Sequence, residues 1–86
     1  MHAVENQVRE VLSNVAGLPH DVDATANLYL DLGVASVHAL AVLSELESRF
    51  GVEIPDDDFV AATTVESLTA LMADLMEQGR GSSPHA

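Results

Sequence analysis

The sequence predicts an all-α fold: a small bundle of three longer helices and one short helix, with an unusually long first loop. Three observations support this class. Hydrophobic residues recur at spacings of three and four in three separate segments, a glycine follows each of these segments, and the stretch between the first two has no helical period. With 86 residues, of which 48% are hydrophobic, the chain can build one modest core. We expect one domain over residues 1–78 and a disordered tail over residues 79–86.

The first predicted helix runs from about residue 3 to residue 16. Its valines and leucine lie on one stripe, at positions 4, 8, 11, 12 and 15, and Gly17 and Pro19 then end it. Residues 18–35 form the long loop, which is rich in Asp, Asn and Thr. Such loops are uncommon in small domains and are often functional. Embedded in it are apolar residues that we expect to pin it to the core: Leu28, Tyr29, Leu30 and Leu32.

The second predicted helix follows Ser36 and ends at Gly51. Its expected core positions are Leu40, Leu43, Leu46 and Phe50. A serine at the start of such a stripe is typical of an N-cap, whose hydroxyl accepts a backbone N–H. Taken alone, the pattern therefore favours a capping role for Ser36.

The last part of the chain predicts a short helix and a longer one. Three consecutive acids at residues 56–58 favour a helix start, because carboxylates are stabilised at the positive end of the helix dipole. Thr63 and Glu66 have the spacing of a capping box. Hydrophobic residues then recur at helical spacing up to Gly79, with Leu68, Leu71 and Leu75 as core and Met72 and Met76 as gap-fillers.

Charge and composition exclude several functions. Fourteen acids face three arginines and no lysine, for a net charge of -11, which argues against nucleic acid and favours partners with basic surfaces. The chain has no cysteine, which excludes disulfides and thiolate metal sites. Neither a membrane-spanning run nor a signal peptide is apparent, so we expect a cytoplasmic protein.

No residue pattern predicts a catalytic or metal site. An EF-hand loop starting at Asp21 would place Ala26 and Leu32 where glycine and glutamate are required. The three consecutive acids at residues 56–58 diverge around a helix instead of converging on one ion. His38 is two residues from Ser36, which is poor spacing for a general base, and no G-x-S-x-G motif is present. An acidic calcium-binding protein remains an alternative, and we predict that the chain is not an enzyme.

Residues 31–59, DLGVASVHALAVLSELESRFGVEIPDDDF, resemble the acyl carrier protein family. The family's signature is a D-L-G-x-D-S-L run, whose serine receives 4′-phosphopantetheine; here the run is D-L-G-V-A-S-V at residues 31–37. The E-I-P-D string at residues 53–56 and the Thr-Thr-Val at residues 63–65 are also similar to the family. The resemblance covers nearly the whole chain except the tail and implies that Ser36 is the attachment site.

The resemblance implies a free-standing, monomeric carrier. A phosphopantetheinyl transferase would load Ser36 from coenzyme A, and the arm would hold a thioester cargo for ligases, synthases or transferases with basic docking patches. The expected docking residues are Asp31, Val37, His38, Ala41, Ser44, Glu45, Glu47, Asp56, Asp57 and Asp58.

Two positions depart from the family pattern: Ala35 replaces the usual Asp, and Val37 replaces the usual Leu. The missing Asp bears on how readily Ser36 is modified. Few acids on the exposed face of the second helix favour a specialised acyl or polyketide pathway over general fatty acid synthesis. Two alternatives stay open: an aminoacyl or peptidyl carrier, and an unmodified helical interaction module in which Ser36 is only a cap.

Overall fold

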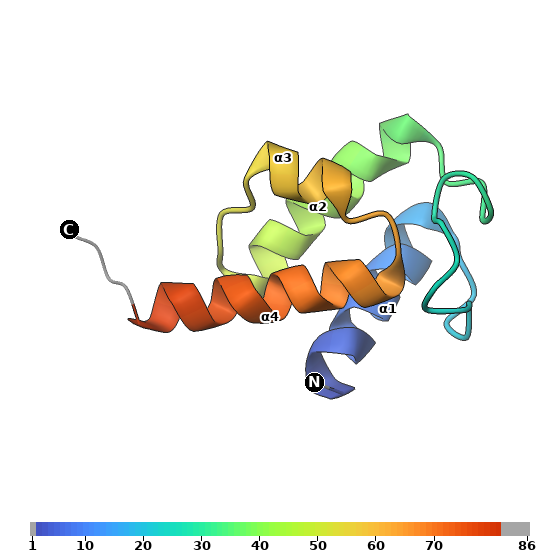
Figure 1. Ribbon diagram of the computed structural model, residues 1–86. Helices are drawn as coiled ribbons and strands as arrows, with labels where there is room; N and C mark the ends of the chain where they lie inside the picture. The colour runs from blue at the N-terminus through green and yellow to red at the C-terminus, as the bar shows by residue number, and fades with distance from the viewer. Residues whose placement is uncertain (1, 82–86) are drawn as a thin grey trace.

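The computed structural model describes residues 2–81, and every regular element in that range is helical. Four helices follow one another: α1 (His2–Ala16), α2 (Ser36–Phe50), α3 (Asp56–Ala61) and α4 (Val65–Gly81). Figure 1 shows α4 lying below α2 and α3, with the long first loop at one end of the bundle. The predicted all-α class, with one short helix and a long first loop, is confirmed.

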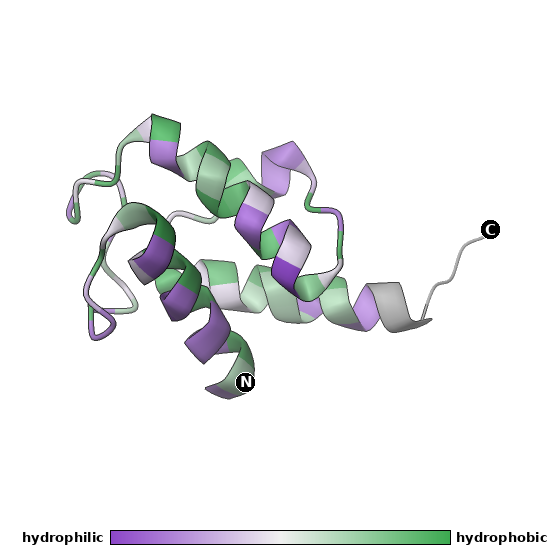
Figure 2. Ribbon diagram, turned by 180° about the vertical axis from the view of Figure 1, so that it is seen from behind, coloured by the Kyte–Doolittle hydropathy of each residue, from purple (hydrophilic) through white to green (hydrophobic). Residues whose placement is uncertain are grey.

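One core holds the helices together. Helix α1 packs against both α2 and α4, and α3 contacts α4. Val8, Val11 and Leu12 on α1 meet Leu46 on α2 and buried residues of α4. In Figure 2 the side of α1 turned toward the viewer is mostly hydrophilic, as expected for a helix that buries one stripe. No helix within residues 2–81 is long and apolar enough to cross a membrane.

The first loop is tied to the core at several points. The Arg9 guanidinium donates hydrogen bonds to the carbonyl oxygens of His20 and Val22, over 2.7 and 2.8 Å. Leu28 is 1% exposed, so the predicted pinning of the loop is confirmed at this residue. Leu30 was expected to do the same, but it is 86% exposed. The cause is a tight turn in which the Asn27 side chain accepts the N–H of Leu30 and turns that residue outward.

Two expected helix caps are displaced by one residue. Ser36 is the first residue of α2; the N-cap is Ala35, in extended conformation, and no side chain caps the helix. The capping pair of α4 is Thr64 with Ser67, whose hydroxyls each accept the other's backbone N–H over 3.0 Å. Thr63 is not the cap, because it lies one residue earlier and its carbonyl oxygen accepts the N–H of Leu28. The sequence pattern fits the neighbouring pair, with serine replacing glutamate.

The ends of the longer helices follow the glycine pattern in part. Gly51 closes α2 with φ +66°, as expected for a left-handed C-cap, and its N–H reaches the Glu47 carbonyl oxygen. Helix α4 was expected to end at Gly79, but it continues to Gly81. Most of the predicted tail, residues 82–86, lies outside the described residues.

Candidate functional site

Ser36 is exposed at the point where the first loop becomes helix α2. Gly33 turns the chain with φ +74°, and Val34 is buried and donates its N–H to the Leu28 carbonyl oxygen over 2.9 Å. This anchor fixes the backbone two residues before the serine. Because no side chain caps α2, its first N–H groups are left as donors for an anion held at Ser36.

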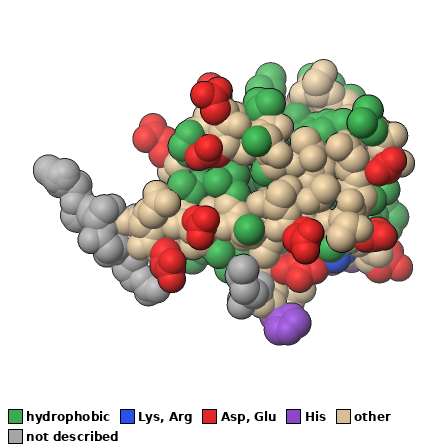
Figure 3. All heavy atoms as spheres, viewed as in Figure 1, with side chains coloured by type: hydrophobic (Ala, Val, Ile, Leu, Met, Phe, Trp, Pro, Cys, Tyr) green, Lys and Arg blue, Asp and Glu red, His purple; other side chains and the backbone are tan. Residues whose placement is uncertain are grey.

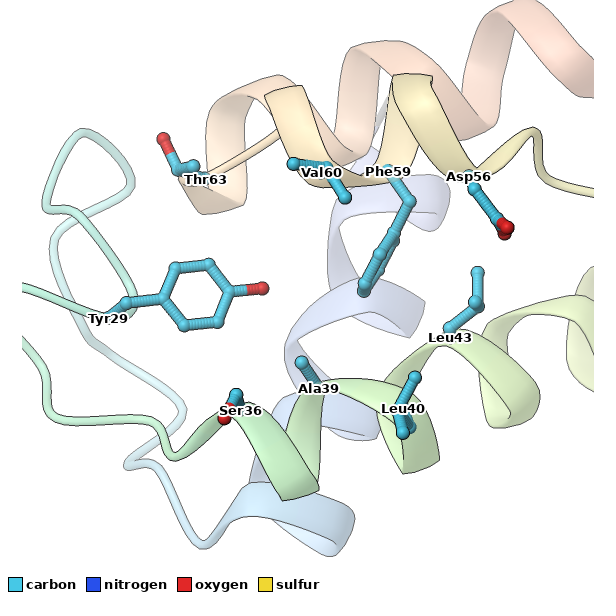
Figure 4. A pocket seen from close by; sticks show the side chains of 9 residues that line it. All are labelled: Tyr29, Ser36, Ala39, Leu40, Leu43, Asp56, Phe59, Val60 and Thr63. Atoms are coloured by element: carbon cyan, nitrogen blue, oxygen red, sulfur yellow. The ribbon is translucent and has the colours of Figure 1, made fainter.

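An apolar pocket opens beside Ser36, between α2 and α3, with the first loop closing one end (Figure 4). Its volume is about 480 Å³, and its lining residues are Tyr29, Ser36, Ala39, Leu40, Leu43, Asp56, Phe59, Val60 and Thr63. No lysine or arginine is among them. A pocket of this size and lining can take an apolar chain of moderate length.

Leu40 was expected to be core, but it lines this pocket and is 69% exposed. The reason is its position around α2. The fully packed residues Val42 and Leu46 are four apart and define the buried line, whereas Leu40 lies about 200° around the helix from Val42. The predicted stripe therefore combined two residues that line the pocket, Leu40 and Leu43, with core residues such as Leu46.

Tyr29 enters the pocket from the first loop. In Figure 4 its ring lies across the opening from α2 and its hydroxyl points toward the interior. Its backbone N–H is held by the Asn27 side chain over 2.9 Å, which fixes the base of the side chain. Burial raises the pKa of the Tyr29 phenol, so it stays protonated and can donate a hydrogen bond at neutral pH. Sequence reasoning assigned it only to loop packing.

The expected docking acids differ in whether their carboxylates already have a partner within the protein. Asp31 Oδ2 accepts the Asn27 N–H, Glu47 Oε2 accepts the Ile54 N–H, and Glu45 pairs with Arg49. These three side chains therefore also support local structure. All three acids at residues 56–58 are exposed at the start of α3. No group of three or more metal-ligating side chains gathers within the part of the chain that the structure describes.

The remaining expected docking residues, Val37, His38, Ala41 and Ser44, all lie exposed on α2. The structure adds three apolar residues that the sequence analysis did not assign to docking, Leu30, Leu40 and Val60, to the expected Val37. Leu40 and Val60 line the pocket while staying mostly exposed, and Leu30 and Val37 directly follow the lining residues Tyr29 and Ser36. We call these four residues the apolar rim. Figure 3 shows hydrophobic side chains gathered over the part of the surface where α2 and α3 lie.

The two described arginines whose side chains are placed both have internal acidic partners. Arg9 pairs with Glu5, and Arg49 pairs with Glu45 and with Glu10 at 2.6 Å. Within the described part of the chain, no ion pair is found for the acids at residues 56–58. The surface beside the pocket thus combines the apolar rim with negative charge at the start of α3, at the end of the pocket far from Tyr29.

Comparison with known protein families shows which family the chain resembles. Residues 6–72 fit a family model described as a phosphopantetheine attachment site. The matched range includes the first loop, Ser36, all of α2 and α3, and the first half of α4.

Proposed function

Because the chain belongs to the phosphopantetheine attachment site family, whose members are non-catalytic carriers with covalently bound 4′-phosphopantetheine, we propose that Ser36 is the attachment residue and the cargo an acyl group. The observation that carries the proposal is the position of Ser36 as the exposed first residue of α2, at the mouth of an apolar pocket. The group's terminal thiol would hold the cargo as a thioester.

The other hydroxyls near the site are poorer candidates. Thr64 and Ser67 are engaged with one another, and Thr25 donates to Asp23. Ser44 and Ser48 are exposed, but they lie in the middle of α2, where the backbone N–H groups are already used within the helix. Among the hydroxyl residues that the structure describes, only Ser36 combines exposure, a position in the first turn of a helix and the preceding D-L-G turn.

The chain's residues support the attached group in two ways. The N–H groups at the start of α2 and the helix dipole would stabilise the negative phosphodiester at Ser36. The apolar lining of the pocket would shelter a carried chain from water, contributing about 25 cal/mol for each Å² of apolar surface buried. Since the chain contains no cysteine, the protein offers no thiol of its own that could compete for the thioester.

The pocket favours an acyl or polyketide cargo over an amino acid. The acid in its lining, Asp56, lies at the end of the pocket opposite Tyr29 in Figure 4. The α-ammonium group of an amino acid would therefore find no carboxylate in the interior of the pocket. An aminoacyl carrier remains the alternative. Loading assays with acyl-activating and amino-acid-activating ligases separate the two cargo classes.

We further propose that partner enzymes dock on the apolar rim and on the acids of α3. Carriers of this family interact with a phosphopantetheinyl transferase and with biosynthetic enzymes. Any enzyme acting at Ser36 must approach the surface on which Val37 and Leu40 are each 69% exposed. A partner with an apolar centre and basic residues facing α3 fits this surface. The sparse charge on α2 is consistent with a specialised pathway.

The test is an intact mass measurement after incubation with a broad-specificity phosphopantetheinyl transferase and coenzyme A. We expect the wild-type protein to gain one phosphopantetheine and Ser36→Ala to gain none. Ser48→Ala is the matched control, since it removes an exposed α2 hydroxyl and should be modified like the wild type. An unchanged wild-type mass would favour the unmodified interaction module instead.

A further inference from the structure

We propose that the Tyr29 hydroxyl selects the cargo: it donates a hydrogen bond to a carbonyl or hydroxyl oxygen of the carried chain, so the pocket prefers an oxygenated chain over a fully saturated one. This inference rests on the proposed function and deepens it by naming the cargo class. The observation behind it is that the Tyr29 hydroxyl points into a pocket whose interior is otherwise apolar.

The polar groups of the lining are unevenly placed. In Figure 4 the Thr63 hydroxyl points away from the interior and the Asp56 carboxylate lies at the end of the pocket far from Tyr29. Ser36 lies on the first turn of α2, below the Tyr29 ring. The interior between them is formed by Ala39, Leu40, Leu43, Phe59 and Val60. The Tyr29 hydroxyl is therefore the donor that an occupant of the interior would meet.

The hydroxyl has no protein partner within residues 2–81, since the hydrogen bond found for Tyr29 involves its backbone N–H. Before the pocket is filled, water can satisfy the phenol. A chain that enters the pocket displaces this water, and a saturated chain would leave the phenol donor unpaired, which disfavours its entry. A chain with an oxygen at the right depth replaces the lost bond. A partly buried donor that the occupant shields from water in this way disfavours analogues that lack the matching acceptor.

The phenol is also suited to act as a neutral donor. Burial raises the pKa of Tyr29, which keeps its proton in place across the physiological pH range. The backbone that carries this side chain is held at two neighbouring points: the Asn27 side chain accepts the Tyr29 N–H, and the Thr63 carbonyl oxygen accepts the Leu28 N–H. A fixed donor discriminates better than a mobile one, because its direction is set before the cargo arrives.

Amide carbonyls of the phosphopantetheine arm share this acceptor chemistry, so the experiment must separate arm from cargo. We would load the wild type, Tyr29→Phe and Ser48→Ala with hexanoyl-phosphopantetheine and with 3-oxohexanoyl-phosphopantetheine. Two quantities are measured: the rate of thioester hydrolysis and the NMR shifts of the Leu43 and Val60 methyl groups. Ser48→Ala is the matched control, since it removes an exposed hydroxyl on α2 that does not line the pocket.

In the wild type we expect the 3-oxohexanoyl chain to shift the pocket methyl groups more than the hexanoyl chain. Tyr29→Phe should reverse this preference and speed hydrolysis of the 3-oxohexanoyl thioester roughly fivefold to tenfold, relative to any change for the hexanoyl thioester. Ser48→Ala should behave like the wild type. Equal effects of Tyr29→Phe on both cargoes would assign the bond to the arm, and no effect on either would remove the role of Tyr29; each result overturns the proposal.

A second measurement keeps the inference testable if Ser36 is not modified. The unmodified protein is titrated with the N-acetylcysteamine thioesters of hexanoate and 3-oxohexanoate, and the same methyl groups are followed by NMR. Tighter binding of the 3-oxo compound by the wild type, lost in Tyr29→Phe, supports cargo selection. Equal binding of the two compounds by the wild type contradicts it. A failure of attachment at Ser36 is seen separately, in the intact mass.

Discussion

The backbone N–H of Leu28 donates a hydrogen bond to the carbonyl oxygen of Thr63 over 2.8 Å. This bond joins the first loop to the connection between α3 and α4, two segments that are far apart in the sequence. The next residue in the loop, Tyr29, and Thr63 itself both line the pocket beside Ser36. The wall of the pocket opposite α2 therefore depends on how firmly the loop is anchored at Leu28.

Truncating this anchor should destabilise the protein and loosen the pocket wall. Leu28 is 1% exposed, so Leu28→Ala leaves a cavity and should lower the free energy of unfolding by about 2–5 kcal/mol. Leu30→Ala is the matched control, because Leu30 is nearby in the same loop but 86% exposed, and it should change stability by no more than about 0.5 kcal/mol. Urea unfolding measures both, and equal losses would contradict the proposed anchor.

Arg9 should hold the first part of the loop. Arg9→Met keeps the aliphatic stem but removes the hydrogen bonds to the carbonyl oxygens of His20 and Val22. Amide exchange at Thr25 and Ala26, whose N–H groups bind Asp23, should become roughly tenfold faster.

Arg49→Met serves as the control for Arg9→Met. It removes another arginine with acidic partners, Glu10 and Glu45, but has no contact with the loop. Exchange at Thr25 and Ala26 should stay unchanged in this variant. If both variants accelerate exchange equally, the effect reflects lost overall stability and Arg9 has no special role in the loop.

The hydrogen bonds from Thr25 to Asp23 should make the stability of the fold depend on pH. The backbone N–H of Thr25, and then its hydroxyl, lower the pKa of Asp23 below its ordinary value of 3.8. A carboxylate with a lowered pKa in the folded state stabilises the fold above its unfolded pKa, and this contribution is lost as the pH falls through the folded value. NMR titration should place Asp23 below 3.8, and in Thr25→Val, which keeps the backbone donor, part of the shift should disappear. A higher pKa than 3.8 in the wild type would contradict the turn geometry.

Much of the fold follows from local sequence, but the site follows from it only in part. Gly51 has no side chain to oppose the left-handed backbone that ends α2, and so its role could be predicted from its position alone. The sequence correctly predicts that Ser36 lies at the start of α2. It wrongly predicts that the Ser36 side chain caps the helix. Whether the N-cap falls on Ala35 or Ser36 is decided by where the buried Val34 fixes the chain, which is a tertiary effect.

The pocket could not be predicted from periodicity. Leu40 and Leu43 occupy equivalent positions in the hydrophobic pattern of α2. Because α3 and Tyr29 lie opposite α2, Leu40 forms part of the pocket wall and is 69% exposed. Similarly, the apolar Val60 is 72% exposed, because Phe59 takes the buried position in α3. A six-residue helix has too little period to show which side faces inward.

Docking on the apolar rim should make partner recognition depend more on α2 hydrophobic residues than on charge. Val37→Ser and Leu40→Ser should each lower kcat/KM for phosphopantetheine transfer to Ser36 by about tenfold, because each removes an apolar contact worth about 1.5 kcal/mol or more when buried. Raising the salt concentration should leave this loss unchanged, since desolvation of an apolar contact is not screened.

Two variants control the docking experiment. Met76→Ser removes an apolar side chain that is 41% exposed on α4, away from the lining of the pocket, and should leave kcat/KM unchanged. Asp57→Asn removes a charge at the start of α3 and should lower kcat/KM only at low salt, because an exposed charge acts mainly on the rate of encounter. If the losses in Val37→Ser and Leu40→Ser disappear at high salt, or Met76→Ser matches them, the apolar rim is not the docking surface and charge carries recognition instead.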